Sequence, residues 1–497
     1  MSERMLQLAH AIQTSKGALP LEEGAETIEV SAPASTAASL YERVRTTLEY
    51  QDDHLLRRNA IARILRRFLG SDMPLEDLAE NLLRELVWAK YLPNKQVPVK
   101  FVDELRPVFL KYGPLLDGVE KTNKPEFAFQ FVLDIIANEL DYAVVSHKNE
   151  ELTVGYMYEQ MRTRSEWDPG IVATEEQKDL LLYIAVHKTL LKSDRSTLRY
   201  RTLTLYYPEW SGSSNVSQIA EIAEGLDSVI STIDSQIEHP LVEKLSQKLR
   251  RQAGVFRTLQ DVIEENPLDF KTFVESEPDL FGRSIWKALK KRTKLFRTKL
   301  RRTVLRAVLF LFITKMALAV ILEVPYDLIL HGELFVVPLL INILFHPLLL
   351  AFIGMTVVVA ERRNADDYKD VVRALVVGAN HDFLSFRIRK DRFGTWSTIF
   401  SFVYALVLVL VYGIIGFALY QFGFNAFSIG LFLFFLSLVT FFGIRIRAST
   451  RDVVLSPQRR GVFGSIFDII VLPIVHFGRW LSLKVSKINV FIYFFDF

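Results

Sequence analysis

The sequence contains no cysteine, and this absence excludes several classes of site at once. A chain without thiols has no disulfide, no thiolate ligand for zinc or iron–sulfur clusters, and no cysteine nucleophile. The first 282 residues also lack the GxxxxGK, GxGxxG, GxSxG and HExxH motifs of phosphate loops, dinucleotide sites, esterases and zinc proteases. These absences favour a protein that is not an enzyme and uses no cofactor or metal. The histidines of this half stand singly, as His10, His54, His147, His187 and His239.

The N-terminus lacks the features of a secretory signal peptide. The opening residues, MSERMLQLAHAIQTSKGALPLEEGAE, contain no basic region followed by an uninterrupted apolar run. We therefore expect the first half of the chain to stay on the side of the membrane where it is synthesised.

Charge is distributed very unevenly along the chain. Residues 1–282 hold 32 Lys and Arg against 45 Asp and Glu, a net charge of −13. Residues 283–497 hold 28 against 12, a net charge of +16, and this half is also strongly apolar. An acidic front half and a basic, apolar back half predict a soluble domain joined to a membrane domain.

Four apolar runs in the back half are long enough to cross a bilayer as helices. Crossing roughly 30 Å of hydrocarbon at 1.5 Å per residue takes about 20 residues. The last three runs contain no Asp, Glu, Lys or Arg, so a buried helix of a soluble protein is a poor alternative. The predicted spans are 304–324, 334–360, 397–420 and 427–444.

Basic residues alternate between the connections and thereby predict the orientation. Segment 287–302 has nine Lys and Arg and no acid, whereas connection 325–333 has none. Connection 361–394 has eight, connection 421–426 has none, and residues 445–460 have five. By the positive-inside rule, both termini face the cytoplasm and the spans form two hairpins. The outer connections are too short for an external ligand-binding domain.

The C-terminal tail does not read as a fifth span. Residues 445–497 hold an apolar core of only about 15 residues, short for a crossing, broken by Asp468 and Pro473. Basic residues lie on both sides of it, so a full crossing would violate the charge rule. We expect a re-entrant or interfacial helix with Trp480 at headgroup level. The chain stops inside an aromatic run, so either its end lies flat in the interface or the natural protein continues.

The membrane half resembles a group of bacterial membrane proteins. The stretches GRWLSLKVSKINVF, EVPYDL and NILFHPLLL are similar to those of multi-span proteins from candidate-phylum bacteria that carry no assigned activity. The resemblance implies a location in the bacterial cytoplasmic membrane and nothing about chemistry.

The front half is predicted to be helical, so that the whole chain is all-α. Residues 1–38 are poor in apolar side chains after the first turns and predict a disordered arm. Apolar residues then recur at three- and four-residue steps over 39–207, the acidic cytoplasmic domain. The stretch 197–210 is ambiguous between a helix and a strand. Residues 208–282 follow as a linker and a helical-hairpin neck.

The neck carries a narrow apolar stripe that has two interpretations. From Ile219 to Ile237 apolar residues step by three or four, and a second stripe follows Pro240. Such stripes are typical of helices that pack on their own domain, but also of a coiled coil that would make a homo-oligomer. The pattern lasts under three heptads before the proline, which favours packing on the same domain.

A basic helix over 283–303 precedes the first span. Ile285, Leu289, Phe296 and Leu300 form an apolar side, which is the pattern of a helix lying on anionic headgroups. Each cation would add on the order of 1 kcal/mol; ordinary positive-inside flanking sequence is the alternative, and nucleic acid is not an expected partner. The candidate lipid contacts are Trp286, Lys287, Lys290, Lys291, Arg292, Lys294, Arg297, Lys299, Arg301 and Arg302.

Lys315 lies in the middle of the first span, where a charge is costly and often functional. Asn342 and His346 share one face of the second span at a similar depth, so a hydrogen bond from the ammonium to one of them is expected. A proton or ion relay would make the protein a transporter or channel subunit. A structural clamp between two helices is the favoured interpretation, because no carboxylate is expected nearby and Glu323 is assigned to the outer rim.

The cytoplasmic connection 361–396 contains an adjacent His381–Asp382 pair. A second histidine or an acid at acyltransferase spacing is missing, since Phe386 stands at that position. An interfacial amphipathic segment is the better interpretation. The sequence as a whole predicts an integral membrane protein whose cytoplasmic helical domain is a scaffold or adaptor for a cytoplasmic protein partner.

Overall fold

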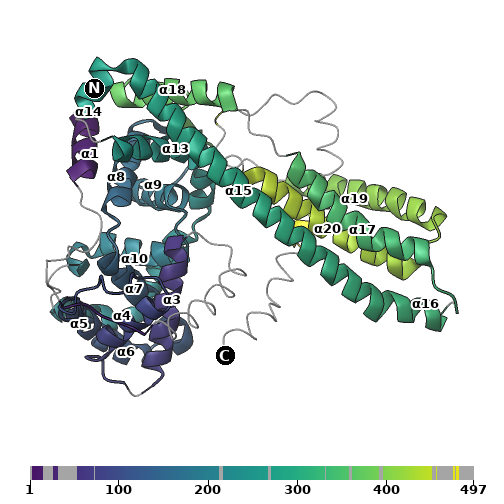
Figure 1. Ribbon diagram of the computed structural model, residues 1–497, viewed down its shortest axis with the longest axis horizontal. Coiled ribbons are helices and arrows are strands. Elements are labelled where there is room, and N and C mark those ends of the chain that lie inside the picture. Colours follow the sequence, from purple (N-terminus) through teal and green to yellow (C-terminus); the bar gives the residue numbers. More distant parts are fainter. Residues whose placement is uncertain are drawn as a thin grey trace. The chain divides into compact units, whose positions relative to one another are not determined.

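The structure is a computed structural model and is almost entirely helical, which confirms the predicted all-α class. The chain forms two compact units (Figure 1). Unit 1 comprises Met1–Ser276 and Ala374–Ile388, and unit 2 comprises Glu277–Arg373 and Arg389–Phe497. The residues that the structure describes are 3–14, 26–31, 53–71, 73–211, 216–266, 270–330, 332–356, 361–390, 396–449, 455, 474–475 and 477–480.

Unit 1 is a helical domain with one short pair of strands. Its elements are α1 (Glu3–Thr14), α3 (Asp53–Leu69), α4 (Leu78–Trp88), α5 (Phe101–Lys111), α6 (Gly113–Val119), α7 (Pro125–Val144), α8 (Lys148–Thr163), β1 (Ser165–Trp167), α9 (Glu175–Leu190), α10 (Arg195–Tyr206), η1 (Pro208–Ser211), α11 (Val216–Glu224), α12 (Leu226–Ile237), α13 (Pro240–Glu265), α14 (Phe270–Ser276) and β2 (Phe386–Ile388). The ambiguous stretch 197–210 is thus a helix followed by a short 3-10 turn.

Two helices without a solvated face organise the core of unit 1. Helix α7 begins at Pro125, whose fixed φ suits the first turn, and is buried on nearly all sides. It packs against α3, α5, α6, α10 and α12, while α9 packs mainly against α13 and α8. The stripe on α12 and α13 therefore packs within its own domain, as favoured from the sequence. The term neck was wrong for α13, which belongs to the core.

The expectation of a disordered arm is wrong where the structure describes the N-terminus. Residues Glu3–Thr14 form helix α1, whose Met5, Leu8, Ala9 and Ile12 are buried against α8, α13 and α14. Four apolar residues at helical spacing are enough for docking, although the polar segment that follows dilutes them in a composition average. The rest of the predicted arm lies outside the described residues, apart from 26–31, where Ile28 N donates to Val97 O.

The predicted linker at the start of segment 208–282 begins with a buried side chain that anchors it to the domain. Trp210 is 1% exposed, and its indole N–H donates to Tyr112 Oη at 3.2 Å and to Glu139 Oε2 at 3.1 Å. Lys111 Nζ bonds Glu139 and also donates to the Trp210 carbonyl at 2.9 Å. Proline and glycine made this stretch read as a linker, but the single aromatic residue fixes its first half to the domain.

The connection 361–396, predicted to be cytoplasmic and interfacial, returns to unit 1 with its second half. Strand β2 pairs in parallel with β1, with Phe386 opposite Ser165 and Ile388 opposite Trp167. Gln252 of α13 donates to the Phe383 carbonyl at 2.9 Å. The predicted interfacial segment is therefore a strand of the helical domain, because Phe386 and Ile388 alternate with Arg387 and bury one face.

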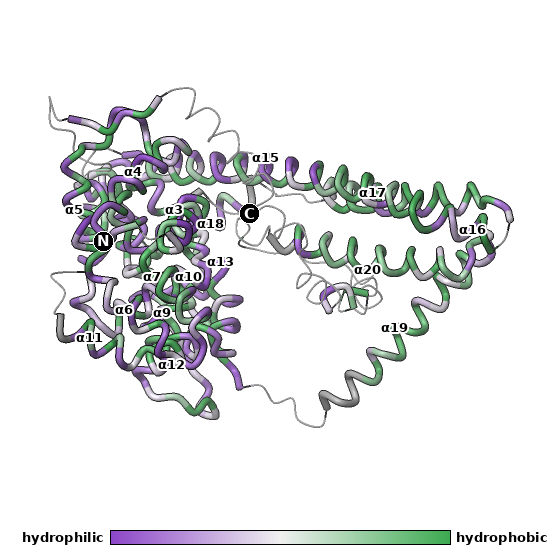
Figure 2. The backbone as a smooth tube through the Cα atoms, turned by 90° about the horizontal axis from the view of Figure 1, so that it is seen from below, coloured by the Kyte–Doolittle hydropathy of each residue, from purple (hydrophilic) through white to green (hydrophobic). Residues whose placement is uncertain are grey.

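Within the described residues, unit 2 has four helices long and apolar enough to cross a membrane, as predicted. Figure 2 shows α17 and α20 hydrophobic along most of their length, whereas hydrophilic and hydrophobic residues alternate along the first half of α15. Because α15 passes through a π-helical turn into α16, the first candidate span belongs to a 53-residue helical stretch. The elements are α15 (Pro278–Leu318), η2 (Ala319–Glu323), α16 (Val324–Leu330), α17 (Val336–Met355), α18 (Glu361–Val377), α19 (Trp396–Gln421) and α20 (Ala426–Ser449).

The basic segment 283–303 is not a separate helix. It is the first half of α15, which runs without a break into the first span (Figure 1). A straight helix cannot cross the bilayer with one half and lie flat on its surface with the other. Ile285 and Leu289, expected in the interface, are 0% and 4% exposed. Leu289 instead lines a narrow crevice that Ala365 of α18 closes.

Small residues let the spans approach closely. A Cβ on Gly354 would lie 2.6 Å from Val304 Cγ1, and one on Gly443 would lie 2.7 Å from Ile353 Cδ1. Glycine at such contacts is typical of membrane helix pairs. Helix α17 consequently packs tightly between α15 and α20.

Only six residues of the predicted C-terminal helix lie within the described residues. Phe477 packs edge-on against Tyr412, with ring centroids 5.9 Å apart, and Gly478 lies against the Ser437 backbone. Tyr412 and Ser437 are in the middle of α19 and α20, so these contacts favour a re-entrant segment over one lying flat in the interface. Trp480 is 55% exposed.

Candidate functional site in the membrane bundle

Lys315 is completely buried in the bundle and bonded to the second span. Its ammonium nitrogen donates to Asn342 Oδ1 at 2.6 Å. It also lies 4.1 Å from the centroid of the Phe435 ring, a cation–π contact with α20. The structure thus brings Lys315 and Asn342 together at the depth inferred from the hairpin geometry.

Asn342 connects Lys315 to a carboxylate that sequence reasoning placed elsewhere. Its amide nitrogen donates to Glu323 Oε1 at 2.7 Å, while its amide oxygen accepts from Lys315. The Lys315 ammonium has only donors, so it fixes the amide oxygen toward itself and leaves the amide nitrogen facing Glu323. Glu323 is 1% exposed and therefore belongs to the buried site, so its assignment to the outer rim was wrong.

The π-helical turn explains why Glu323 faces Lys315. Residues Ala319–Glu323 form this turn, closed by a bond from Val324 N to Ala319 O. In a regular α-helix, positions eight residues apart lie about 80° apart around the axis. One extra residue in a turn makes them equivalent to positions seven apart, about 20° from alignment. The turn therefore brings the carboxylate onto the face of the ammonium.

His346 is buried beside this pair, but the Lys315 ammonium donates its hydrogen bond to Asn342 instead. Its Nδ1 lies 3.2 Å from the Asn342 carbonyl, and its Nε2 lies 2.9 Å from the Phe432 carbonyl of α20. A neutral imidazole has one N–H and can donate to only one of these oxygens. The shorter contact favours donation from Nε2, which ties α17 to α20. The expected bond from Lys315 is made to the amide alone.

A second buried carboxylate extends the network toward the hairpin connections. Asp327 is 2% exposed and lies one turn beyond Glu323. It accepts from Asn425 Nδ2 at 2.6 Å and from Phe335 N at 3.4 Å. Asn425 also caps α20, because its Oδ1 accepts from Ser428 N at 2.8 Å. We call Lys315, Asn342, Glu323, Asp327 and Asn425 the intramembrane polar network.

The predicted lipid contacts are spread along about 24 Å of helix, at 1.5 Å per residue. Only the last of them, from Arg297 to Arg302, lie within about 10 Å of the apolar run. A flat docking surface made of all ten residues is therefore not present. Trp286 instead stacks against its own helix neighbour, with Lys290 Nζ 4.6 Å from its ring centroid.

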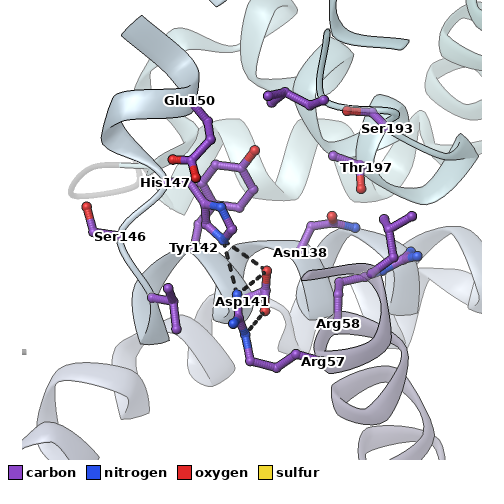
Figure 3. Close-up of a pocket in the computed structure, with 13 residues that line it drawn as sticks. Arg57, Arg58, Asn138, Asp141, Tyr142, Ser146, His147, Glu150, Ser193 and Thr197 are labelled. Atoms are coloured by element: carbon purple, nitrogen blue, oxygen red, sulfur yellow. Dashed lines mark hydrogen bonds and ion pairs between the residues drawn. The ribbon is translucent and has the colours of Figure 1, made fainter. Parts of the chain in front are cut away.

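Unit 1 contains a polar cavity of about 200 Å³ where four helices converge (Figure 3). It lies between α3, the turn from α7 to α8, and the start of α10. Asp141 is central: it accepts from Arg57 Nε at 2.6 Å and faces His147 Nε2 at 3.1 Å. Burial alone would raise the pKa of Asp141, but the hydrogen bonds from His147 and Arg57 outweigh burial and lower that pKa.

This cavity can hold a few water molecules or one small polar molecule. At about 30 Å³ per water, its volume corresponds to roughly seven waters. Arg58 Nε and Ser193 Oγ are buried without a hydrogen-bond partner among the described residues that line it. The ring of His147 is committed to Asp141, so the arrangement provides no activated nucleophile. No sequence motif signalled the cavity, because its residues come from four separate helices.

No metal site is present in the part of the chain that the structure describes, where no three His, Asp or Glu side chains converge. The His381–Asp382 pair likewise forms no such group, and His381 Nδ1 accepts from Phe383 N at 3.1 Å. No protein-family model, no curated protein and no solved structure matches the chain.

Proposed function

We propose that this is a multi-pass protein of the bacterial cytoplasmic membrane whose helical unit 1 acts as a scaffold or adaptor, without enzymatic activity of its own, for a cytoplasmic protein partner. One observation carries the proposal. Unit 1 has its own core, yet the chain passes between it and the membrane unit three times, after Ser276, Arg373 and Ile388. A partner bound to unit 1 is thereby held at the membrane, which is what a tethered scaffold must do.

Exposed apolar side chains supply plausible contacts for the partner. Leu110 and Leu205 of unit 1 are 49% and 43% exposed, although the domain has a full core. Photo-crosslinking residues at these two positions of the full-length protein should capture a discrete partner in cells. Leu110→Asp and Leu205→Asp should abolish co-purification of that partner, while the exposed-site control Glu104→Gln should not. Crosslinking no stronger than that from position 104 would contradict the proposal.

The orientation proposal rests on the basic connections and uses the absence of cysteine. A single cysteine at Gly332, in the first hairpin connection, should react with an impermeant maleimide in intact cells. A cysteine at Val172, a fully exposed residue of unit 1, should react only after permeabilisation. The reverse pattern would refute a cytoplasmic location of unit 1 and the termini.

We also propose that anionic headgroups contact the membrane end of the basic segment. The support is the distance along the helix. Lys299, Arg301 and Arg302 directly precede the apolar run, whereas Lys290 and Lys291 lie about 12–18 Å further out, beyond a Debye length of about 8–10 Å. Replacing Arg301 and Arg302 by Gln should reduce the thermal stabilisation by anionic lipid. The same change at Lys290 and Lys291 should have little effect; equal effects would contradict this assignment.

A transporter or channel subunit is the second candidate function. The observation that favours it is the buried pair of Glu323 and Asp327, because the lack of carboxylates was the argument against a relay. Lys315→Leu tests it: retained membrane yield with lost ion flux in proteoliposomes supports transport. Lost yield or assembly supports a structural clamp worth roughly 1 kcal/mol.

A further inference from the structure

The charges of the intramembrane polar network do not balance when all groups are ionised. Lys315 contributes one positive charge, and Glu323 and Asp327 each contribute one negative charge. The two carboxylates lie four residues apart on successive helical turns, where like charges repel. An uncompensated charge in the apolar bundle is costly, so one bound proton makes the set neutral.

The depth of the two carboxyl groups indicates which of them holds that proton. Asp327 accepts from Asn425 Nδ2 and from Phe335 N, two donors at the hairpin connections. Glu323 accepts from Asn342, with Ser428 of α20 also in reach of its carboxyl group, so the number of donors does not distinguish the two groups. Glu323 lies one helical turn further from the connections, and its hydrogen-bonded link to Lys315 runs through the Asn342 amide. Its ionised form is therefore the more costly one in the apolar bundle.

Among the residues that the structure describes, the network extends toward the end of the bundle that holds the hairpin connections. Asp327 lies between Glu323 and the hairpin connections, where Phe335 and Asn425 belong to the chain reversals. On the other side of Lys315, a layer of apolar side chains fills the bundle: Leu311, Leu350, Phe435 and Val439. Leu311 lies one turn before Lys315 on the same helix. This layer separates the ammonium from the end at which α15 enters.

The remaining polar groups near this layer do not bridge it. His346 faces the carbonyls of Asn342 and Phe432 and carries its N–H to one of them. Tyr412 of α19 bonds Ser437 of α20, whose hydroxyl also lies 2.7 Å from Leu433 O. These contacts are local within their helix pairs and do not connect Lys315 to the α15 end.

We propose that Glu323 is a proton-binding site that exchanges its proton through Asp327 with the side of the membrane where the hairpin connections lie. The proton passes from solvent to the Asp327 carboxylate and then to Glu323, and no bond other than O–H changes. The inference stands whether or not unit 1 is a scaffold, and it requires no transport across the apolar layer. It deepens the transporter alternative by naming the loading side.

Infrared spectroscopy of the full-length protein in sealed proteoliposomes tests the proposal directly. Vesicles are sorted on affinity resin by whether an N-terminal tag is outside, and the external pH is stepped while the internal buffer stays fixed. We expect a protonated-carboxyl band that is lost in Glu323→Gln. It should follow the external pH when the tag is inside, and stay unchanged when the tag is outside. Glu333→Gln, at an exposed residue of the connection, is the matched control and should keep the band.

Two further variants make the outcome decisive. Glu323→Asp keeps a carboxyl group and should shift the band, which assigns it even if the amide variant fails to fold. Asp327→Asn removes one negative charge from the network, so Glu323 should hold its proton only at a lower external pH than in the wild type, and the response of the band should slow. The proposal is overturned if no Glu323-dependent band titrates in the folded protein. It is also overturned if the band follows the pH on the tag side, or if Asp327→Asn leaves the response unchanged.

Discussion

Acidification should destabilise unit 1 through one histidine that cannot be protonated while it is buried. His187 is 0% exposed on α9, and its Nδ1 has no hydrogen-bond partner among the described residues. Its Nε2 lies 2.9 Å from Tyr183 Oη and 3.6 Å from Glu151 Oε2. Burial lowers the pKa of His187 to about 4; the nearby Glu151 carboxylate opposes this shift, and Arg201 adds to it.

The sign and size of the effect follow from linkage. Below its ordinary pKa of about 6.5 the unfolded state binds a proton that the folded state does not accept until about pH 4, so stability falls as the pH falls through that window. From about pH 7.5 to about pH 5 the loss is about 2 kcal/mol, or roughly 25-fold in the folding equilibrium. This is a large part of a typical stability of 5–15 kcal/mol.

Hydrogen exchange of the α9 amides in the detergent-solubilised protein measures this loss. Protection factors, corrected for the intrinsic pH dependence of exchange, should fall roughly 25-fold in the wild type over that range. His187→Gln cannot titrate, so its protection should stay nearly flat whatever its absolute stability. His10→Gln, at an exposed residue of α1, is the matched control and should behave like the wild type. Equal slopes for the wild type and His187→Gln would refute the reasoning.

Three further changes test packing and charge in the two units. Gly443→Ala should destabilise the bundle by about 1–3 kcal/mol, because its Cβ would meet Ile353; a second change, Ile353→Ala, should restore part of the loss in thermal unfolding. Trp210→Phe should cost about 1–2 kcal/mol in urea unfolding by removing two buried indole hydrogen bonds, whereas Trp88→Phe, at a partly exposed residue, should cost little. Asp141 has a lowered pKa, so its contribution to the free energy of unfolding is present above the ordinary carboxyl pKa and is lost as the pH falls below it. Asp141→Asn should therefore flatten the acid limb of the plot of stability against pH. An unchanged acid limb would contradict this assignment.

Features that depend on composition or helical periodicity were predictable from the sequence. The four spans follow from length and hydropathy, because a bilayer fixes how many apolar residues a helix needs. The contact between Lys315 and Asn342 follows from the same geometry, since two antiparallel helices joined by a short connection set the depth of every residue. The stripe on α12 was also assigned correctly to its own domain.

Long-range pairing inside unit 1 was not predictable in this way. Strand β2 is three residues long and pairs with a strand more than 200 positions away, so neither its length nor the neighbouring sequence predicts this pairing. The cavity around Asp141 likewise collects side chains from α3, α7, α8 and α10. Periodicity assigns residues to faces of one helix, but it does not say which faces meet. The burial of Trp210 was not predicted either, because the proline, glycine and serine residues around it are typical of an exposed linker.

The two wrong predictions in the membrane unit concern the basic segment and Glu323. Both depend on where a helix stays regular and where it does not. The basic segment was treated as a flat surface helix because its charge differs from that of the span, but charge does not break a helix. Without proline or glycine between Trp286 and Lys315, α15 continues as one helix, so the cations of its first half extend along the helix away from the span. Conversely, the assignment of Glu323 to the outer rim of the bundle rests on a regular α-helix. The π turn inserts one residue at this point and changes the face on which Glu323 lies. Deleting Val320 removes the extra residue and leaves the carboxylate seven residues after Lys315 in a regular helix, so it should stay on the face of Asn342 and keep the infrared band of the buried acid. Loss of the band would show that the alignment needs the π turn itself.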